Sequence, residues 1–143
     1  PDDRARRCDM LLALGEALPT RQANVRLDGH AIQCRIYAEG PRGAPVHAGK
    51  VRRLEAPVGE GLRHDLGLTA GAWVSTQEAP LIAKMIAHGA DRSEALTRLR
   101  AALSEYVVEG VATNLPLLRR IAADPAFAAG PLDASRVDAL ASL

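Results

Sequence analysis

"GHAIQCRIYAEG", residues 29–40, alternates apolar and polar side chains without a break. The apolar positions are Ile32, Cys34, Ile36 and Ala38. Because successive side chains of a strand point to opposite faces, a period of two predicts a β-strand with one buried face. The other face, which carries Gln33, Arg35, Tyr37 and Glu39, is either solvated or part of a site.

Further strands are predicted on both sides of glycine- and proline-rich loops. They cover residues 50–57, 58–68 and 80–89, and a Gly/Pro loop over residues 40–49 precedes them. A helix is predicted at the N-terminus, with Asp2 or Asp3 as its cap and Gly15 and Pro19 at its end.

After residue 90 the apolar period becomes helical. Leucines at 96, 99 and 103 share a face with Tyr106, Asp91 and Glu94 have capping-box spacing, and Gly110 predicts the end of this helix. A second helix follows, capped by Thr113 or Asn114, and a short third helix is predicted over residues 136–140. Strands segregated from helices indicate an α+β fold, an antiparallel sheet with flanking helices.

The composition suits one compact domain of a reduced, cytoplasmic protein. The chain has 143 residues, 48% of them hydrophobic, and a net charge of +1, which favours neither nucleic acid nor a membrane surface. Its two cysteines lack Cys-x-x-Cys spacing and its four histidines lack ligand spacing, so no metal site is expected. A disulfide between Cys8 and Cys34 stays an alternative. No signal peptide or membrane span is evident, and the opening "PDDRARR" predicts a fragment boundary.

One cluster in the predicted strands contains residue types that commonly take part in catalysis or binding. Arg63, His64 and Asp65 are consecutive in "GLRHDLG". Alternation places Arg63 and Asp65 on one face of the strand and His64 on the other. From spacing alone, a surface ion pair of little energetic weight is the favoured interpretation.

Three motifs in order resemble the C-terminal domain of biotin carboxylase. They are "GHAIQCRIYAE", "GLRHD" and the long segment of residues 79–127, in which "VEGVATNLP" (108–116) is nearly verbatim. The resemblance runs from about residue 11 to about residue 132. It implies that residues 1–20 form a linking helix from a preceding ATP-grasp region. Residues 21–143 would then form the C-terminal domain, of the rudimentary hybrid-motif type.

The resemblance also implies a reaction. In this family ATP activates bicarbonate, and the carboxyl group passes to N1 of biotin on a carrier protein. The glycine-rich lid, the magnesium-binding carboxylates and the bicarbonate-binding segment precede the matched region and are not found in this sequence. The full-length enzyme is therefore expected to use biotin, ATP and Mg²⁺. None is expected to bind this fragment, which should be inactive alone.

Within the matched region, Arg63 of "GLRHD" aligns with the catalytic arginine of the family. A guanidinium is always charged and has several donors, which suits the negative charge on the ureido oxygen of biotin. The resemblance also implies a homodimer of the full-length enzyme, in which the turn at His88, Asp91 and Arg92 is a subunit contact. The open alternative is that Asp91 only caps its own helix.

Other expected partners are the upstream ATP-grasp domain, a biotin carboxyl carrier protein or domain, and a carboxyltransferase, which selects the acceptor. The sequence departs from the family pattern at Gln33, in the loop "GAPVHAG", and at Gln77, Glu78 and Ala79, which replace Tyr-Tyr-Asp. An acetyl-, propionyl- or other acyl-CoA carboxylase is the main expectation. The alternatives are the same domain of urea or pyruvate carboxylase, and a non-catalytic interaction or dimerisation domain of a degenerate homologue.

Overall fold

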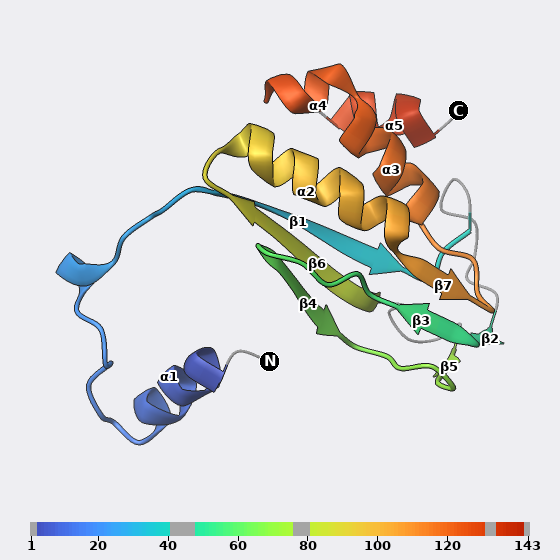
Figure 1. Cartoon of the computed structure of the whole chain (residues 1–143). Coiled ribbons are helices and arrows are strands. Elements are labelled where there is room, and N and C mark those ends of the chain that lie inside the picture. The colour runs from blue at the N-terminus through green and yellow to red at the C-terminus, as the bar shows by residue number, and fades with distance from the viewer. Residues whose placement is uncertain (1–2, 41–47, 76–80, 131–133, 142–143) are drawn as a thin grey trace.

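The fold consists of antiparallel strands with helices packed on one face of the main sheet (Figure 1). The computed structural model describes residues 3–40, 48–75, 81–130 and 134–141. In chain order the elements are α1 (Asp3–Ala13), η1 (Gln22–Asn24), β1 (His30–Tyr37), β2 (Gly49–Lys50), β3 (Arg53–Glu55), β4 (Leu62–Leu66), β5 (Trp73–Val74), β6 (Leu81–Gly89), α2 (Arg92–Glu105), β7 (Val107–Glu109), α3 (Leu115–Ala123), α4 (Pro125–Ala129) and α5 (Ala134–Ala141). The α+β prediction is confirmed.

The main sheet has three strands in the order β1-β6-β4, so β6 lies at its centre and is antiparallel to both neighbours. The register of β6 with its two neighbours defines two rows of side chains across the sheet. Met85 lies opposite Cys34 on one side and His64 on the other, while Lys84 lies opposite Arg35 and Asp65. Adjacent residues of β6 face opposite ways, so these two rows occupy opposite faces of the sheet.

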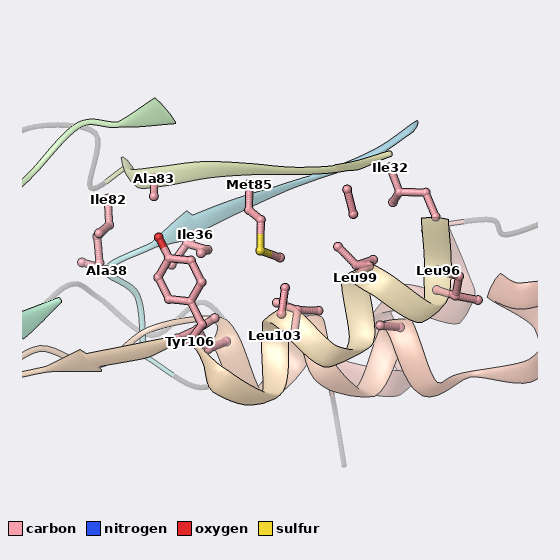
Figure 2. Close-up of a cluster of buried hydrophobic side chains, with 14 of the residues drawn as sticks. Ile32, Ile36, Ala38, Ile82, Ala83, Met85, Leu96, Leu99, Leu103 and Tyr106 are labelled. Atoms are coloured by element: carbon pink, nitrogen blue, oxygen red, sulfur yellow. The ribbon is translucent and has the colours of Figure 1, made fainter. Parts of the chain in front are cut away.

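The first of these faces is the core. Ile32 and Ile36 of β1 are buried and Gln33 and Arg35 are exposed, as the alternation predicts. Helix α2 covers this face and packs against β6 and β1 (Figure 2). The leucines and the tyrosine at helical spacing all turn out to be buried, namely Leu96, Leu99, Leu103 and Tyr106.

Helix α2 begins where predicted and ends earlier than predicted. The Asp91 side chain accepts a hydrogen bond from the Glu94 amide at 2.9 Å, which confirms the cap. The helix stops at Glu105, and the predicted last turn is strand β7, paired with β3. Aromatic and β-branched side chains at 106–108 favour extended backbone, and the Arg119 guanidinium donates to the Leu103 and Tyr106 carbonyls at the helix end.

Short elements account for the other differences. The strand predicted over residues 50–57 is two strands, β2 and β3, and β5 and α4 were not predicted. Strands β2 and β5 have two residues each, which is too few for an alternating pattern to be recognised in the sequence. Most of the loop 40–49 and the positions Gln77, Glu78 and Ala79 lie outside the described residues.

The N-terminal helix ends at Ala13, before Gly15, as predicted. Asp3 is its first residue, and Asp2 lies outside the described residues. In Figure 1, α1 and the segment that follows it extend away from the sheet. Met10, Leu12 and Leu14 are exposed there. The division into a linking helix over residues 1–20 and a domain over 21–143 stays a prediction.

Asn114 fastens the end of β1 to the start of α3. Its Oδ1 accepts from the Tyr37 amide at 3.0 Å and its Nδ2 donates to the Arg35 carbonyl at 3.1 Å. Its own amide donates to the Tyr37 carbonyl at 3.2 Å. Of the two predicted caps of α3, Asn114 stands at the N-cap position, but its side chain makes no capping hydrogen bond and is used across the fold. The side chain of the other candidate, Thr113, accepts from the Leu115 amide at 3.4 Å.

Replacing Asn114 with alanine is expected to lower the free energy of unfolding by about 2 kcal/mol, because two hydrogen bonds of roughly 1 kcal/mol each are lost. Denaturant unfolding measures this loss. Asn24→Ala is the matched control, because Asn24 is exposed in η1, and it should change stability by no more than about 0.5 kcal/mol. Equal stability of the two variants would show that the Asn114 contacts contribute nothing.

Candidate functional site

The face of the main sheet opposite α2 carries a group of charged side chains. Across the three strands, Arg35 of β1 lies opposite Lys84 of β6, and Lys84 lies opposite Asp65 of β4. Arg63 shares this face with Asp65 two residues away. Figure 1 shows α2 and α3 over the other side of the sheet. We call Arg35, Arg63, Asp65 and Lys84 the charged face.

Arg63 and Asp65 form an ion pair on this face. The Arg63 Nε and Nη2 atoms both lie 3.2 Å from Asp65 Oδ1, and Nη2 lies 3.4 Å from Oδ2. The Arg63 side chain is 48% exposed and the Asp65 side chain 35% exposed. The predicted placement of both residues on one face is confirmed, and the ion pair expected from spacing alone is present.

Arg35 and Lys84 are two cations directly opposite each other. Arg35 is exposed and Lys84 half-buried, and within the described residues neither side chain makes a hydrogen bond or an ion pair. Like charges at opposed cross-strand positions destabilise a sheet. With three cations and one carboxylate, the charged face has an excess of positive charge and suits a small anion.

From its alternation, Arg35 was expected on the polar face of its strand, but nothing in the sequence marked it as a site residue. The signal that was missing is the strand pairing. Only the register of β1 on β6 brings Arg35 next to Lys84, and only the register of β4 on β6 adds Asp65 and its partner Arg63. These residues are widely separated in the sequence.

His64 lies on the core face, as predicted, against the Tyr106 ring at 5.7 Å between ring centroids. Both of its ring nitrogens are buried, and within the described residues neither makes a hydrogen bond of standard geometry. Burial lowers the pKa of His64, while the nearby Pro57 backbone and the Asp65 carboxylate act in the opposite direction. The imidazole is therefore best accommodated in its neutral form.

The low pKa of His64 predicts acid sensitivity. A group with a lowered pKa in the folded state binds its proton more readily in the unfolded state, so its contribution to stability is present above pH 6.5 and is lost as the pH falls through the folded pKa. We expect the free energy of unfolding to fall from pH 7.5 to pH 5.5 by less in His64→Leu than in wild type. Equal falls in the two proteins would exclude His64 as a cause.

The two cysteines of the chain are not joined to each other. Cys8 and Cys34 are both free, so the alternative of a disulfide between them is not realised. Cys34 packs against the core, and burial raises its pKa to about 11. A thiol with so high a pKa stays protonated and unreactive near neutral pH.

The predicted subunit contact lies at the end of β6. His88 Nε2 is 2.9 Å from the Asp28 carbonyl oxygen, and Asp91 caps α2. The Arg92 guanidinium lies 3.2 Å from His30 Nε2 and 5.0 Å from the centre of the Phe127 ring. All three side chains therefore have partners within the chain. Their role between subunits stays a prediction.

The predicted contact turn at His88, Asp91 and Arg92 is connected to the charged face through backbone hydrogen bonds. The His88 amide donates to the Gly61 carbonyl at 2.8 Å, directly before β4 begins, and Arg98 Nη1 donates to the His88 carbonyl at 2.8 Å. Arg63 is two residues beyond Gly61. The structure thus places the start of the strand that carries Arg63 beside the predicted contact turn.

Among the described residues, no group of three or more His, Cys, Asp or Glu side chains is placed to hold a metal ion. No helix in the described ranges is long and apolar enough to cross a membrane.

A three-stranded antiparallel sheet, covered by helices on one face and cationic on the other, defines an α+β domain with a candidate anion-binding surface. Residues 33–139 match the family described as biotin carboxylase C-terminal domain. The chain belongs to this family.

The relatives are several times longer than the chain. It is 44% identical over 119 residues to a biotin carboxylase of Pseudomonas aeruginosa, which covers 83% of the chain and 26% of that protein. It is 38% identical over 125 residues to the human mitochondrial propionyl-CoA carboxylase alpha chain, covering 85% of the chain and 17% of that protein. The chain spans about a quarter of the length of the bacterial biotin carboxylases it matches.

A solved structure supports the same conclusion about the fold. The biotin carboxylase domain dimer of Hydrogenobacter thermophilus 2-oxoglutarate carboxylase, in complex with MgADP, ADP and bicarbonate, has a TM-score of 0.81 and 35% sequence identity. The match covers 86% of the chain and 27% of that domain. The predictions of the family and of its fold are confirmed.

Proposed function

We propose that this chain is the C-terminal part of an enzyme that uses ATP to carboxylate N1 of carrier-bound biotin with bicarbonate. The observation that carries the proposal is the excess positive charge of the charged face, on a domain whose relatives are named biotin carboxylases. Bicarbonate is an anion, and the ureido oxygen of biotin gains negative charge in the reaction. Fixed cations stabilise both.

Biotin, when bound, supplies the nitrogen that receives the carboxyl group. The residues of this chain fit a supporting role toward it, because the charged face has guanidinium groups at an exposed sheet surface. Such a group would hold the negative charge on the ureido oxygen. ATP and Mg²⁺ would bind the upstream ATP-grasp region.

Two arginines compete for this role. Arg63 is the candidate from the motif match. Its guanidinium is held by Asp65 through Nε and Nη2, so part of its charge is already neutralised. Arg35 is the second candidate, and a specific observation favours it: its side chain is exposed, without an ion pair in the described part of the chain, and opposite a second cation.

The proposed partners are the upstream ATP-grasp domain, a biotin carboxyl carrier protein or domain, a carboxyltransferase, and a second copy of the full-length protein, all in the cytoplasm. An acyl-CoA carboxylase is the proposed setting. Pyruvate or urea carboxylase is the alternative within the same reaction class, and a non-catalytic interaction domain is the alternative outside it.

A coupled ATPase assay with Mg²⁺, bicarbonate and free biotin tests the proposal. The full-length parent is expected to turn over, and residues 1–143 alone are expected to show no activity above buffer. Turnover by the isolated chain would show that residues 1–143 contain the catalytic groups that the proposal assigns to the upstream region. A full-length parent that folds but lacks bicarbonate-dependent ATP cleavage would favour the interaction domain.

A further inference from the structure

We infer that Arg98 is a positioning residue for Arg63, because its guanidinium fixes the start of strand β4 and thereby the place of the Arg63 side chain on the charged face. This inference rests on the proposed function and on the candidate role of Arg63 within it. Arg98 lies on α2, on the other side of the sheet, and reaches the end of β6 beside which β4 begins. Its effect on the reaction is exerted through Arg63.

The Arg98 guanidinium joins helix α2 to the end of β6. Its Nη2 atom donates to Glu94 Oε1 at 2.7 Å, one turn earlier on the same helix, and its Nη1 atom donates to the His88 carbonyl at 2.8 Å. The second carboxylate oxygen of Glu94 accepts from the Ala90 amide at 2.6 Å. Hydrogen bonds to charged groups are stronger than those between neutral groups. The guanidinium, whose side chain is 24% exposed, is therefore held from two sides.

The residue that precedes β4, Gly61, lies directly against this guanidinium. The Gly61 carbonyl accepts from the His88 amide at 2.8 Å, so one backbone group of His88 binds Gly61 and the other binds Arg98. Gly61 has a φ of +72°, and a Cβ atom there would collide with Arg98 Nη1 and the His88 carbonyl oxygen. Both the backbone conformation and the close approach therefore require glycine. The exposed Glu60 carboxylate, 3.7 Å from Arg98 Nη2, adds little.

The register of β4 decides to which face Arg63 points. Within the described residues β4 pairs with β6 on one edge only, and Arg63 is its second residue, opposite Ile86. A slip by one residue turns every side chain of a strand to the other face. Such a slip would move Arg63 into the core and His64 onto the charged face. The contacts at Gly61, two residues before Arg63, therefore fix the feature on which the role of Arg63 depends.

The test is a double-mutant cycle in the full-length parent, measured as the rate of carboxylation of free biotin. Arg98→Gln is expected to lower kcat by about tenfold to a hundredfold, since a displacement of about 1 Å can cost that much, and to leave the KM for ATP within about twofold. In an Arg63→Ala background the same substitution should change kcat by no more than about twofold, because its effect passes through Arg63. Arg98→Lys should recover part of the loss, since an ammonium can still donate to the His88 carbonyl.

Arg100→Gln is the matched control. Arg100 is on the same helix and also donates to a backbone carbonyl, from Nε to Ala122 at 2.6 Å, but this carbonyl belongs to α3 and not to the sheet. The control should lose about as much stability in urea as Arg98→Gln does and keep kcat within about twofold of wild type. Losses of kcat of the same size in both variants would attribute the effect to stability and overturn the inference. If Arg98→Gln does not fold, Arg98→Lys replaces it in the cycle.

Hydrogen exchange of the full-length protein gives a second readout that does not require turnover. Residues 60–66 should exchange faster in Arg98→Gln than in wild type and at an unchanged rate in Arg100→Gln. Unchanged exchange in Arg98→Gln would overturn the inference. So would an unchanged kcat, an equal effect in the wild-type and Arg63→Ala backgrounds, or a wild-type rate in Arg63→Ala, while the proposed function stands. A parent without bicarbonate-dependent ATP cleavage would refute the proposed function, and the exchange measurement would still decide whether Arg98 holds the start of β4.

Discussion

Arg35→Ala in the full-length parent is expected to lower the rate of biotin carboxylation by about 10²–10³-fold, the loss for one removed donor of an oxyanion site, or roughly 2.7–4 kcal/mol. The reason is the charge pattern of the sheet. Arg35 is an exposed guanidinium opposite Lys84 and makes no ion pair within the described residues. The measurement is the rate of carboxylation of free biotin at saturating ATP and bicarbonate.

Arg63→Ala is the comparison that the motif match requires. If Arg63 has the role assigned by resemblance, this variant should show the 10²–10³-fold loss instead. Its contact with Asp65 leads us to expect a smaller loss than in Arg35→Ala, because the carboxylate already offsets part of the guanidinium charge. A larger loss in Arg63→Ala than in Arg35→Ala would reverse our order of the two arginines.

A control separates charge from folding in this comparison. Arg52→Ala removes an exposed arginine between β2 and β3, away from the charged face. It should leave the carboxylation rate within about twofold of wild type, since surface substitutions are usually nearly neutral. Losses of similar size in all three variants would indicate general damage to the domain and would support neither arginine.

Local sequence signals predicted the parts of the fold that depend on local physics. The alternation over residues 29–40 predicted β1 and its buried face, and the spacing of Asp91 and Glu94 predicted the start of α2. Both signals lie within a few residues. The predicted end of α2 was wrong because the observed end depends on Arg119, from a later helix, and on the pairing of β7 with β3.

In the candidate site, too, local patterns predicted some features and missed those that depend on contacts between distant segments. The faces of Arg63, His64 and Asp65 followed from alternation. The opposition of Arg35 and Lys84 depends on the register between strands that are about fifty residues apart, which no local pattern reports. Asn114 is similar, because a residue typical of helix caps binds the backbone of β1 instead. Residues that act across strands were therefore the ones that sequence reasoning missed.

Met85→Ala should lower the free energy of unfolding by about 2–5 kcal/mol, the range for deleting a buried large aliphatic side chain. Met85 is 0% exposed at the centre of β6. Figure 2 shows its side chain directed from the sheet toward Leu99 and Leu103 of α2. A domain of this size has a total stability of roughly 5–15 kcal/mol, so this truncation would remove a large share of it.

The chain provides a matched control for this prediction, because it has two methionines. Met10 lies on α1 and is 66% exposed, so Met10→Ala should change stability by no more than about 0.5 kcal/mol. Met85→Leu keeps most of the buried volume and should cost less than about 1.5 kcal/mol. Urea unfolding of the three variants measures the differences. A loss below about 1 kcal/mol in Met85→Ala would contradict the packing of α2 on β6.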